Sequence, residues 1–276
     1  MPEKPKFEDY KAWLIESLSI DLDDPRYKLF YELNATRVLT TAQQHRFFLD
    51  AERFLSDVSA EYDAAGPYGL LMGRNEIQLV TKPFDSVINK SYRKNIAFNN
   101  RFPKEPLDGW CTPSQWFTAF DDIVRGTIVT KYIDAPEFLS SKLTEFADTL
   151  SLVSSVSSRE SDSGYYAYHF YLSIPVEIAQ VDMQPSQIDM KVELQITTQL
   201  QEILRKLTHG FYEELRLDPK QDRRAWKWDF QSPRFQASYL GHTLHLLEGV
   251  IVQLKNRNVS GHPKTELEAK GEASGE

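Results

Sequence analysis

Two segments in the second half of the chain alternate hydrophobic and polar residues with a period of two. Hydrophobic or aromatic side chains occupy every second position over residues 166–174 and again over 188–196. This period predicts two β-strands, each with one face buried in the core and the other exposed. The faces turned away from the core carry Tyr165 and His169 on the first strand, and Glu193 and Gln195 on the second.

Other segments follow the spacing of helices. Hydrophobic residues three and four positions apart predict amphipathic helices over 41–62 and 135–150. The β-branched run over 123–130 predicts a third strand. A last stripe predicts a C-terminal helix that packs on the core through Leu240, Leu244, Leu247, Ile251 and Leu254. Together these elements indicate an α+β fold in which helices flank a sheet.

The pattern divides the chain into four segments. We expect an N-terminal helical segment over 1–65, a core over 66–217, a C-terminal helical segment packed on the core over 218–257, and a disordered tail over 258–276. The tail is expected to be disordered because it has few apolar residues to bury.

Composition is that of a globular protein. The 276 residues are 41% hydrophobic and 26% charged, which is enough for a sizeable core. The single cysteine, Cys111, excludes an intramolecular disulfide and suits a reducing compartment, so we expect a cytoplasmic location. No apolar run has the roughly 18 to 20 residues that span a bilayer, so we expect no membrane partner. The net charge of -8 argues against a protein that coats nucleic acid through its overall field.

Several familiar signatures are missing. The chain has no Gly-x-Gly, no Gly-x-x-x-x-Gly-Lys and no His-x-x-x-His, so a metal site would use oxygen ligands. Asp122 begins the strand predicted over 123–130, and Glu193 lies on the polar face of another. Two such carboxylates facing one cleft suit Mg²⁺, which combines a few carboxylates with phosphate oxygens and water. The alternative is that Glu193 only faces solvent and Asp122 only caps a strand.

A group of cations precedes these strands. Ser86, Lys90 and either Arg93 or Lys94 share one side of a predicted helix, and Lys82 lies just before its start. Such a stripe could hold a triphosphate through charge-assisted hydrogen bonds. A solvated helix face fits the same pattern.

An aromatic side chain follows a glycine at the start of one strand. Tyr165 comes directly after Gly164 and is suited to stacking on a nucleobase. A tyrosine-rich edge strand is the alternative interpretation.

Taken together and in this order, these segments resemble the synthetase domain of the RelA/SpoT family over residues 76–212. The family's ATP box, Arg-x-Lys-x-x-x-Ser-x-x-x-Lys, is similar to the chain at Lys82, Ser86 and Lys90. Val80 stands where the family has the leading Arg.

Three further boxes of the family agree in part. Asp-Ile-x-Gly-x-Arg-Ile resembles the segment that begins at Asp122, with Thr127 in place of Arg and an arginine instead at Arg125. Gly-Tyr-x-Ser-x-His resembles Gly164-Tyr165-Tyr-Ala-Tyr-His169, and Glu-x-Gln-Ile-Arg-Thr resembles Glu193-Leu-Gln195-Ile-Thr197-Thr.

The resemblance implies a nucleotidyltransferase-like mixed sheet and a pyrophosphokinase. In that reaction a 3′-hydroxyl attacks the β-phosphorus of ATP and AMP leaves, with Mg²⁺ bound by Asp122 and Glu193. Gln195 would complete the catalytic set by orienting a substrate or a metal-bound water, and Glu193 would take the proton. The implied ATP ligands are Lys82, Ser86, Lys90, Arg93 and Arg125, and the implied acceptor ligands are Tyr165 and His169.

The residues within these boxes are most similar to those of the toxic small synthetases of toxin–antitoxin systems. Members of that subgroup modify the 3′ CCA end of tRNA or make guanosine or adenosine alarmones. We therefore expect a translation-inhibiting toxin that acts on tRNA and has a separately encoded antitoxin. Arg223, Arg224 and Lys227 are candidate tRNA contacts, although a helix-packing segment fits them equally. The alternatives are synthesis of guanosine tetra- or pentaphosphate from GDP or GTP, and an inactive nucleotide- or RNA-binding scaffold.

Overall fold

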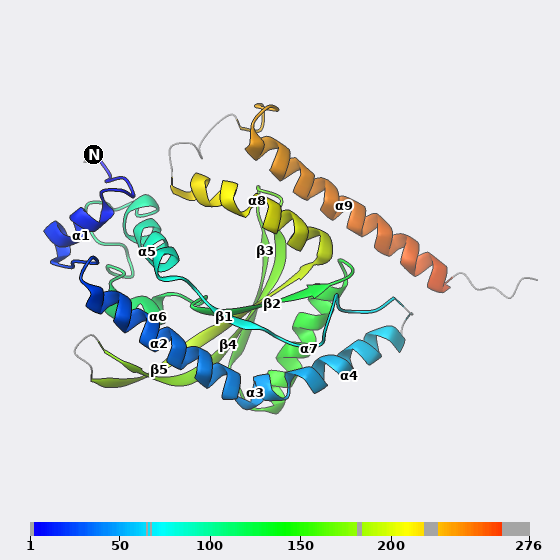
Figure 1. The fold of residues 1–276 in the computed structure, drawn as a ribbon. Helices are drawn as coiled ribbons and strands as arrows, with labels where there is room; N and C mark the ends of the chain where they lie inside the picture. The colour runs from blue at the N-terminus through cyan, green and yellow to red at the C-terminus, as the bar shows by residue number, and fades with distance from the viewer. Residues whose placement is uncertain (1–2, 65, 67, 181–183, 218–225, 261–276) are drawn as a thin grey trace, which may run out of the picture.

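The computed structural model describes residues 3–64, 66, 68–180, 184–217 and 226–260. Over these residues a twisted sheet lies at the centre of the molecule, and helices lie on both of its sides (Figure 1). From residue 261 onward the predicted disordered tail is outside the described residues.

The sheet has five strands in the order β1-β2-β5-β4-β3. β2 and β5 are parallel, and the other neighbouring pairs are antiparallel, so the sheet is mixed. Its members are β1 (Leu79–Thr81), β2 (Val124–Thr130), β3 (Ser154–Glu160), β4 (Tyr166–Ala179) and β5 (Pro185–Thr198). The three predicted strands are β2, β4 and β5, and the α+β class predicted from the sequence is confirmed.

Helices account for most of the remaining described residues. They are α1 (Tyr10–Leu18), α2 (Pro25–Gln44), α3 (Arg46–Leu49), α4 (Ala51–Ala64), α5 (Phe84–Tyr92), the π-helix η1 (Arg93–Ala97), the 3₁₀-helix η2 (Pro113–Gln115), α6 (Trp116–Ala119), α7 (Ala135–Thr149), α8 (Gln199–Leu217) and α9 (Pro233–Ser260). α7 is the helix predicted over 135–150. None of the helices in the described part of the chain combines the length and the apolar character needed to cross a bilayer.

One face of the sheet forms the hydrophobic core. α2 and α7 pack on this face, where Phe170 and Leu194 are fully buried. Phe47 of α3 stacks on Phe170 with 5.8 Å between the ring centroids. The opposite face is crossed by α8, which contacts β2 and β5. The hydrophobic alternation therefore identified correctly most of the strand positions that enter the core, whereas Tyr166 stacks on His245 of α9 instead.

The single helix predicted over 41–62 is interrupted, so that prediction is wrong in its continuity. α2 ends at Gln44, and His45 adopts an extended conformation with φ -70° and ψ 138°. Nδ1 of His45 accepts a hydrogen bond from the Phe47 backbone N–H at 3.3 Å, which begins α3. The break lets Phe47 enter the core while α4 continues in a new direction.

The C-terminal helix is present as α9, but its orientation differs from the prediction. The apolar stripe expected to pack on the core is largely exposed, at 48% for Leu240, 48% for Leu247 and 54% for Leu254. The side turned toward the rest of the molecule carries Gly241, His242, His245, Glu248 and Lys255 instead. Spacing along a helix identifies an apolar face, but it does not identify what the neighbouring surface offers to that face.

Candidate functional site

The register of the strands gathers polar residues on the face of the sheet that is crossed by α8. Arg125 of β2 lies opposite Glu193 of β5. On its other side Glu193 lies opposite Tyr171 of β4, and Gln195 lies opposite His169. Because paired residues project to the same face, all five side chains point to one side of the sheet.

Four of these side chains, those of Arg125, His169, Glu193 and Gln195, form the floor of a cleft with a volume of about 410 Å³. Nine of the residues proposed from the sequence line it, namely Lys82, Lys90, Arg93, Asp122, Arg125, Tyr165, His169, Glu193 and Gln195. Ser86, on α5, is not among the lining residues. Segments that are far apart in the sequence thus meet at one place.

Asp122 lies at the centre of the cationic side of the cleft. Its Oδ2 atom is 2.9 Å from Lys82 Nζ and its Oδ1 atom is 2.7 Å from Lys90 Nζ. Burial raises the pKa of Asp122, but the two lysines outweigh burial and lower it to about 2. The carboxylate is therefore ionised and paired with two cations.

Lys82 is held firmly for a lysine. It follows β1, and its backbone N–H continues the β1–β2 ladder by donating to the Ile123 carbonyl at 2.8 Å. The hydroxyl of Tyr31 donates to the Lys82 carbonyl. Burial lowers the pKa of Lys82, and the charge of Asp122 opposes that effect.

Glu193 forms a second charged centre across the floor of the cleft. His169 Nδ1 lies 2.7 Å from Glu193 Oε1, and Tyr171 donates to the same oxygen at 3.2 Å. Gln195 Nε2 donates to Oε2 at 2.8 Å. Burial raises the pKa of Glu193, hydrogen bonds from His169 and Gln195 lower it, and the net direction is downward.

Burial of this centre differs from the sequence-based expectation. The strand pattern predicted that Glu193 and His169 are exposed, yet only 5% of Glu193 and 8% of His169 is accessible. Both are covered because α8 folds back over β2 and β5. The alternative in which Glu193 only faces solvent is therefore wrong.

Tyr165 lies at the opposite end of the cleft from Lys82, just before β4. Its hydroxyl is 3.2 Å from His169 Nε2, so Tyr165, His169 and Glu193 form a continuous hydrogen-bonded chain. Gly164 precedes it with φ 74°, a conformation that glycine adopts without strain. A Cβ atom on Gly241 of α9 would lie only 2.4 Å from the Gly164 carbonyl oxygen. α9 therefore fixes the loop that carries Tyr165.

α8 supplies a part of the cleft that was not predicted from the sequence. Gln201, Leu204 and Arg205 line the cleft together with Thr208. Arg205 is held by a two-pronged ion pair with Glu202, at 2.7 and 2.9 Å. The signal available was their spacing on the amphipathic helix that directly follows the Glu193 strand.

The candidate RNA contacts are only partly described. Arg223 and Arg224 lie outside the described residues. Lys227 Nζ is 3.5 Å from Asp162 Oδ2, in the loop that leads to Tyr165. This basic side chain is thus adjacent to the loop of the proposed acceptor site.

The carboxylates of Asp122 and Glu193 suit a metal ion that binds together with a phosphate-bearing ligand. Among the described residues no three His, Cys, Asp or Glu side chains form a group that could hold a metal ion. Asp122 and Glu193 line the same cleft, and the charge of Asp122 acts on Glu193. Magnesium commonly uses one or two carboxylates and takes its other ligands from phosphates and water, so this donor set suits Mg²⁺ bound to a nucleotide.

Comparison with known proteins shows the fold. No family model and no curated protein matches the chain. Among solved structures, the small alarmone synthetase 1 from Bacillus subtilis is similar at 16% identity, covering 85% of this chain and 100% of that chain with a TM-score of 0.50. A GTP pyrophosphokinase family protein from Streptococcus pneumoniae is similar at 13% identity, covering 88% and 100%, with a TM-score of 0.43. The chain has the α+β fold of a small alarmone synthetase, with a mixed five-stranded sheet and flanking helices.

The pairing of Asp122 predicts a specific acid dependence of stability. A carboxyl whose pKa falls from 3.8 to about 2 on folding stabilises the fold by roughly 2 kcal/mol. That contribution is complete above about pH 4 and is lost as the pH falls through 2. Urea unfolding of Asp122→Asn from pH 7 to pH 2 in metal-free buffer should therefore show a weaker loss of stability on acidification than the unaltered chain. Asp57→Asn, on the exposed surface of α4, controls for removal of any carboxylate.

The close approach of Gly241 to Gly164 predicts a local effect of a methyl group. Gly241→Ala should displace the loop and speed amide hydrogen exchange at Ser161 and Gly164, whose backbone N–H groups donate within that loop. Gly249→Ala is the matched control, since its Cβ would meet nothing within 4 Å on the same helix. Equal rates of amide hydrogen exchange in the two variants would contradict the conclusion that α9 fixes this loop.

Proposed function

We propose that the protein is an ATP-dependent pyrophosphokinase that transfers the β,γ-pyrophosphate of ATP to the 3′-hydroxyl of a nucleotide. The observation that carries this proposal is the convergence of two lysines, two carboxylates and an aromatic ring on one cleft. Each group performs a task that the reaction requires. The fold shared with the small alarmone synthetase 1 from Bacillus subtilis agrees with that chemistry.

The donor would bind on the cationic side of the cleft. Lys82 and Lys90 bind a single carboxylate, Asp122, so their combined charge exceeds that of their partner. They can turn to phosphate oxygens while a metal ion takes over Asp122. Arg93 and Arg125 line the same side and add charge for the transferred group.

The metal would be Mg²⁺, held by Asp122, Glu193 and the nucleotide phosphates. It would neutralise charge on the pyrophosphoryl group as the bond to the leaving group breaks.

The acceptor would bind at the other end, with its base stacked on Tyr165. The acceptor 3′-oxygen attacks the β-phosphorus, the bond from that phosphorus to the α,β-bridging oxygen breaks, and AMP leaves. Glu193 accepts the hydroxyl proton, and His169 and Gln195 hold that carboxylate in position. Tyr165 belongs to the same hydrogen-bonded chain as Glu193. An acceptor whose nucleobase stacks on Tyr165 therefore lies beside the carboxylate that takes its proton.

We further propose that the acceptor is the 3′ end of tRNA. Three family arginines are replaced, by Val80, Thr127 and Thr197, and Arg125 lies opposite Val80 on the same face, so the site departs from the family pattern that serves guanosine nucleotides. Lys227 and the exposed Trp226–Trp228 turn lie beside the acceptor loop and suit an RNA strand. GDP or GTP as acceptor is the alternative that the same cleft could serve.

The reaction and its acceptor can be tested together. The chain should transfer label from [γ-³²P]ATP to deacylated tRNA, and Asp122→Asn should lower the rate by at least about a hundredfold because the metal and lysine anchor is lost. Label that appears in GDP or GTP instead identifies guanosine alarmone synthesis. If no acceptor is labelled, the chain is a binding scaffold. Asp57→Asn should retain the full rate.

Two substitutions of Tyr165 distinguish base stacking by its ring from hydrogen bonding by its hydroxyl. Tyr165→Ala should raise the acceptor KM by about five- to a hundredfold, because base stacking on an aromatic ring contributes roughly 1–3 kcal/mol. Tyr165→Phe keeps the ring and loses the hydroxyl that contacts His169, so its acceptor KM should stay near that of the unaltered chain. The ATP KM should change little in both. An unchanged acceptor KM in Tyr165→Ala would exclude stacking.

A further inference from the structure

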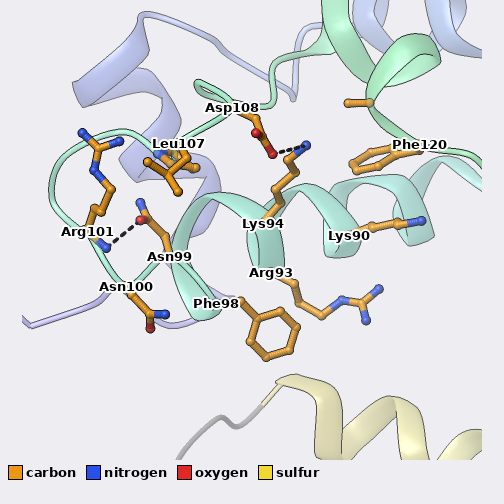
Figure 2. A pocket seen from close by; sticks show the side chains of 12 residues that line it. Lys90, Arg93, Lys94, Phe98, Asn99, Asn100, Arg101, Leu107, Asp108 and Phe120 are labelled. Carbon is orange, nitrogen blue, oxygen red and sulfur yellow. Dashed lines mark hydrogen bonds and ion pairs between the residues drawn. The ribbon is translucent and has the colours of Figure 1, made fainter. Parts of the chain in front are cut away.

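A second cavity of about 430 Å³ adjoins the cleft at α5 and η1 (Figure 2). Lys90 and Arg93 line both cavities, so the two spaces meet along one turn of helix. The second cavity is also lined by Lys94, Arg101 and Phe98. The reaction proposed above uses none of these last three residues.

The π-helix η1 determines what this cavity presents. The Phe98 backbone N–H donates to the Arg93 carbonyl, five residues earlier, at 2.8 Å. One extra residue in the turn brings Arg93 and Phe98 onto the same side of the helix, as Figure 2 shows. Such single turns of π-helix occur frequently at functional sites.

The turn is held rigidly from behind. Asn95 is fully buried, and its side chain donates to Tyr10 and to the Cys111 carbonyl at 2.8 and 3.0 Å. Its Oδ1 atom accepts from the Cys111 N–H at 2.8 Å. Asn99 bonds the carbonyls of Asn95 and Lys104, which fixes the loop that carries Arg101. The cavity wall is therefore preorganised.

Phe98 is 61% exposed although it borders a turn that Asn95 and Asn99 hold through hydrogen bonds. An exposed ring beside cations offers what a nucleotide needs, a stacking surface for the base and positive charge for the phosphate. The one acidic side chain in the lining, Asp108, is 78% exposed and 3.7 Å from Lys94, a weak surface pair that a phosphate can replace.

We propose that this cavity is a second nucleotide subsite, distinct from the donor and acceptor sites. Its ligand is a phosphate-bearing nucleotide whose base stacks on Phe98 and whose phosphate lies among Arg93, Lys94 and Arg101. Two sources provide that chemistry, a free nucleoside polyphosphate and a nucleotide within an RNA strand. Because Lys90 and Arg93 are shared with the cleft, the ligand lies next to the bound ATP.

The test measures equilibrium binding to the full chain without ATP. One probe is a fluorescent hexaribonucleotide with a 3′-terminal phosphate, which cannot serve as an acceptor, and the other is GTP. Phe98→Ala should weaken binding of the hexaribonucleotide or of GTP, whichever occupies the cavity, by about five- to a hundredfold. Phe98→Tyr should retain binding. For the RNA probe, Arg101→Gln should reduce the slope of log affinity against log salt concentration by about one.

The controls are matched in character and lie on other elements. Leu49→Ala removes a side chain that is 68% exposed, and Arg53→Gln removes an exposed cation on α4. Neither should alter binding, and circular dichroism checks that each variant is folded. Loss of RNA affinity identifies a strand as the source, and loss of GTP affinity identifies a free nucleotide.

The proposal is overturned if Phe98→Ala and Arg101→Gln bind both probes as the unaltered chain does, or if that chain binds neither probe. No pyrophosphate transfer enters this measurement. It therefore stays decisive even if no acceptor is labelled in the transfer assay.

Discussion

The arrangement of the cleft depends on one constraint, that a largely buried carboxylate must be paired. Asp122 precedes β2, Lys82 follows β1, and Lys90 belongs to α5, so their contacts tie three elements at one point. Removal of one partner from such a group is expensive, because the remaining charge is left without compensation. The antiparallel pair β1–β2 and α5 are thereby fixed relative to each other, and the two cavities that Lys90 and Arg93 line take their form from them.

The same pairing explains why the proposed donor site suits a charged ligand. Lysines that already neutralise a carboxylate are oriented before a nucleotide binds, so little side-chain entropy remains to be lost. Polyphosphate binding then exchanges one set of anionic partners for another. The Glu193 centre is arranged in the same way, since His169, Tyr171 and Gln195 form hydrogen bonds with its oxygens from neighbouring strand positions. Both ends of the cleft are therefore preorganised.

The hydrophobic pattern of the sequence was sufficient to predict the elements that depend on nearby residues alone. Strand alternation identified β4 and β5 and correctly grouped His169 with Tyr165 and Glu193 with Gln195. It could not reveal that α8 buries Glu193, because that depends on a contact formed only in three dimensions. β3 was missed because its serine-rich sequence lacks a hydrophobic alternation, and β1 because it has three residues. Ser86 lies one turn before Lys90 on α5 and does not reach the cleft lining, which helix spacing alone could not show.

α9 differs from the rest of the molecule in how it is attached. Besides its packing on α8, it is held through polar or small residues: His245 stacks on Tyr166, and Lys255 binds Asp134 at 2.6 Å among aromatic rings. The large heat-capacity increase of unfolding comes from exposing apolar surface. Breaking the contacts of His245 and Lys255 would expose little aliphatic surface, so these contacts would contribute little to the heat-capacity change. The free energy that these contacts contribute to the attachment of α9 would vary little with temperature and more strongly with salt and pH. The free energy of unfolding of the sheet would instead curve steeply with temperature, as expected for a hydrophobic core.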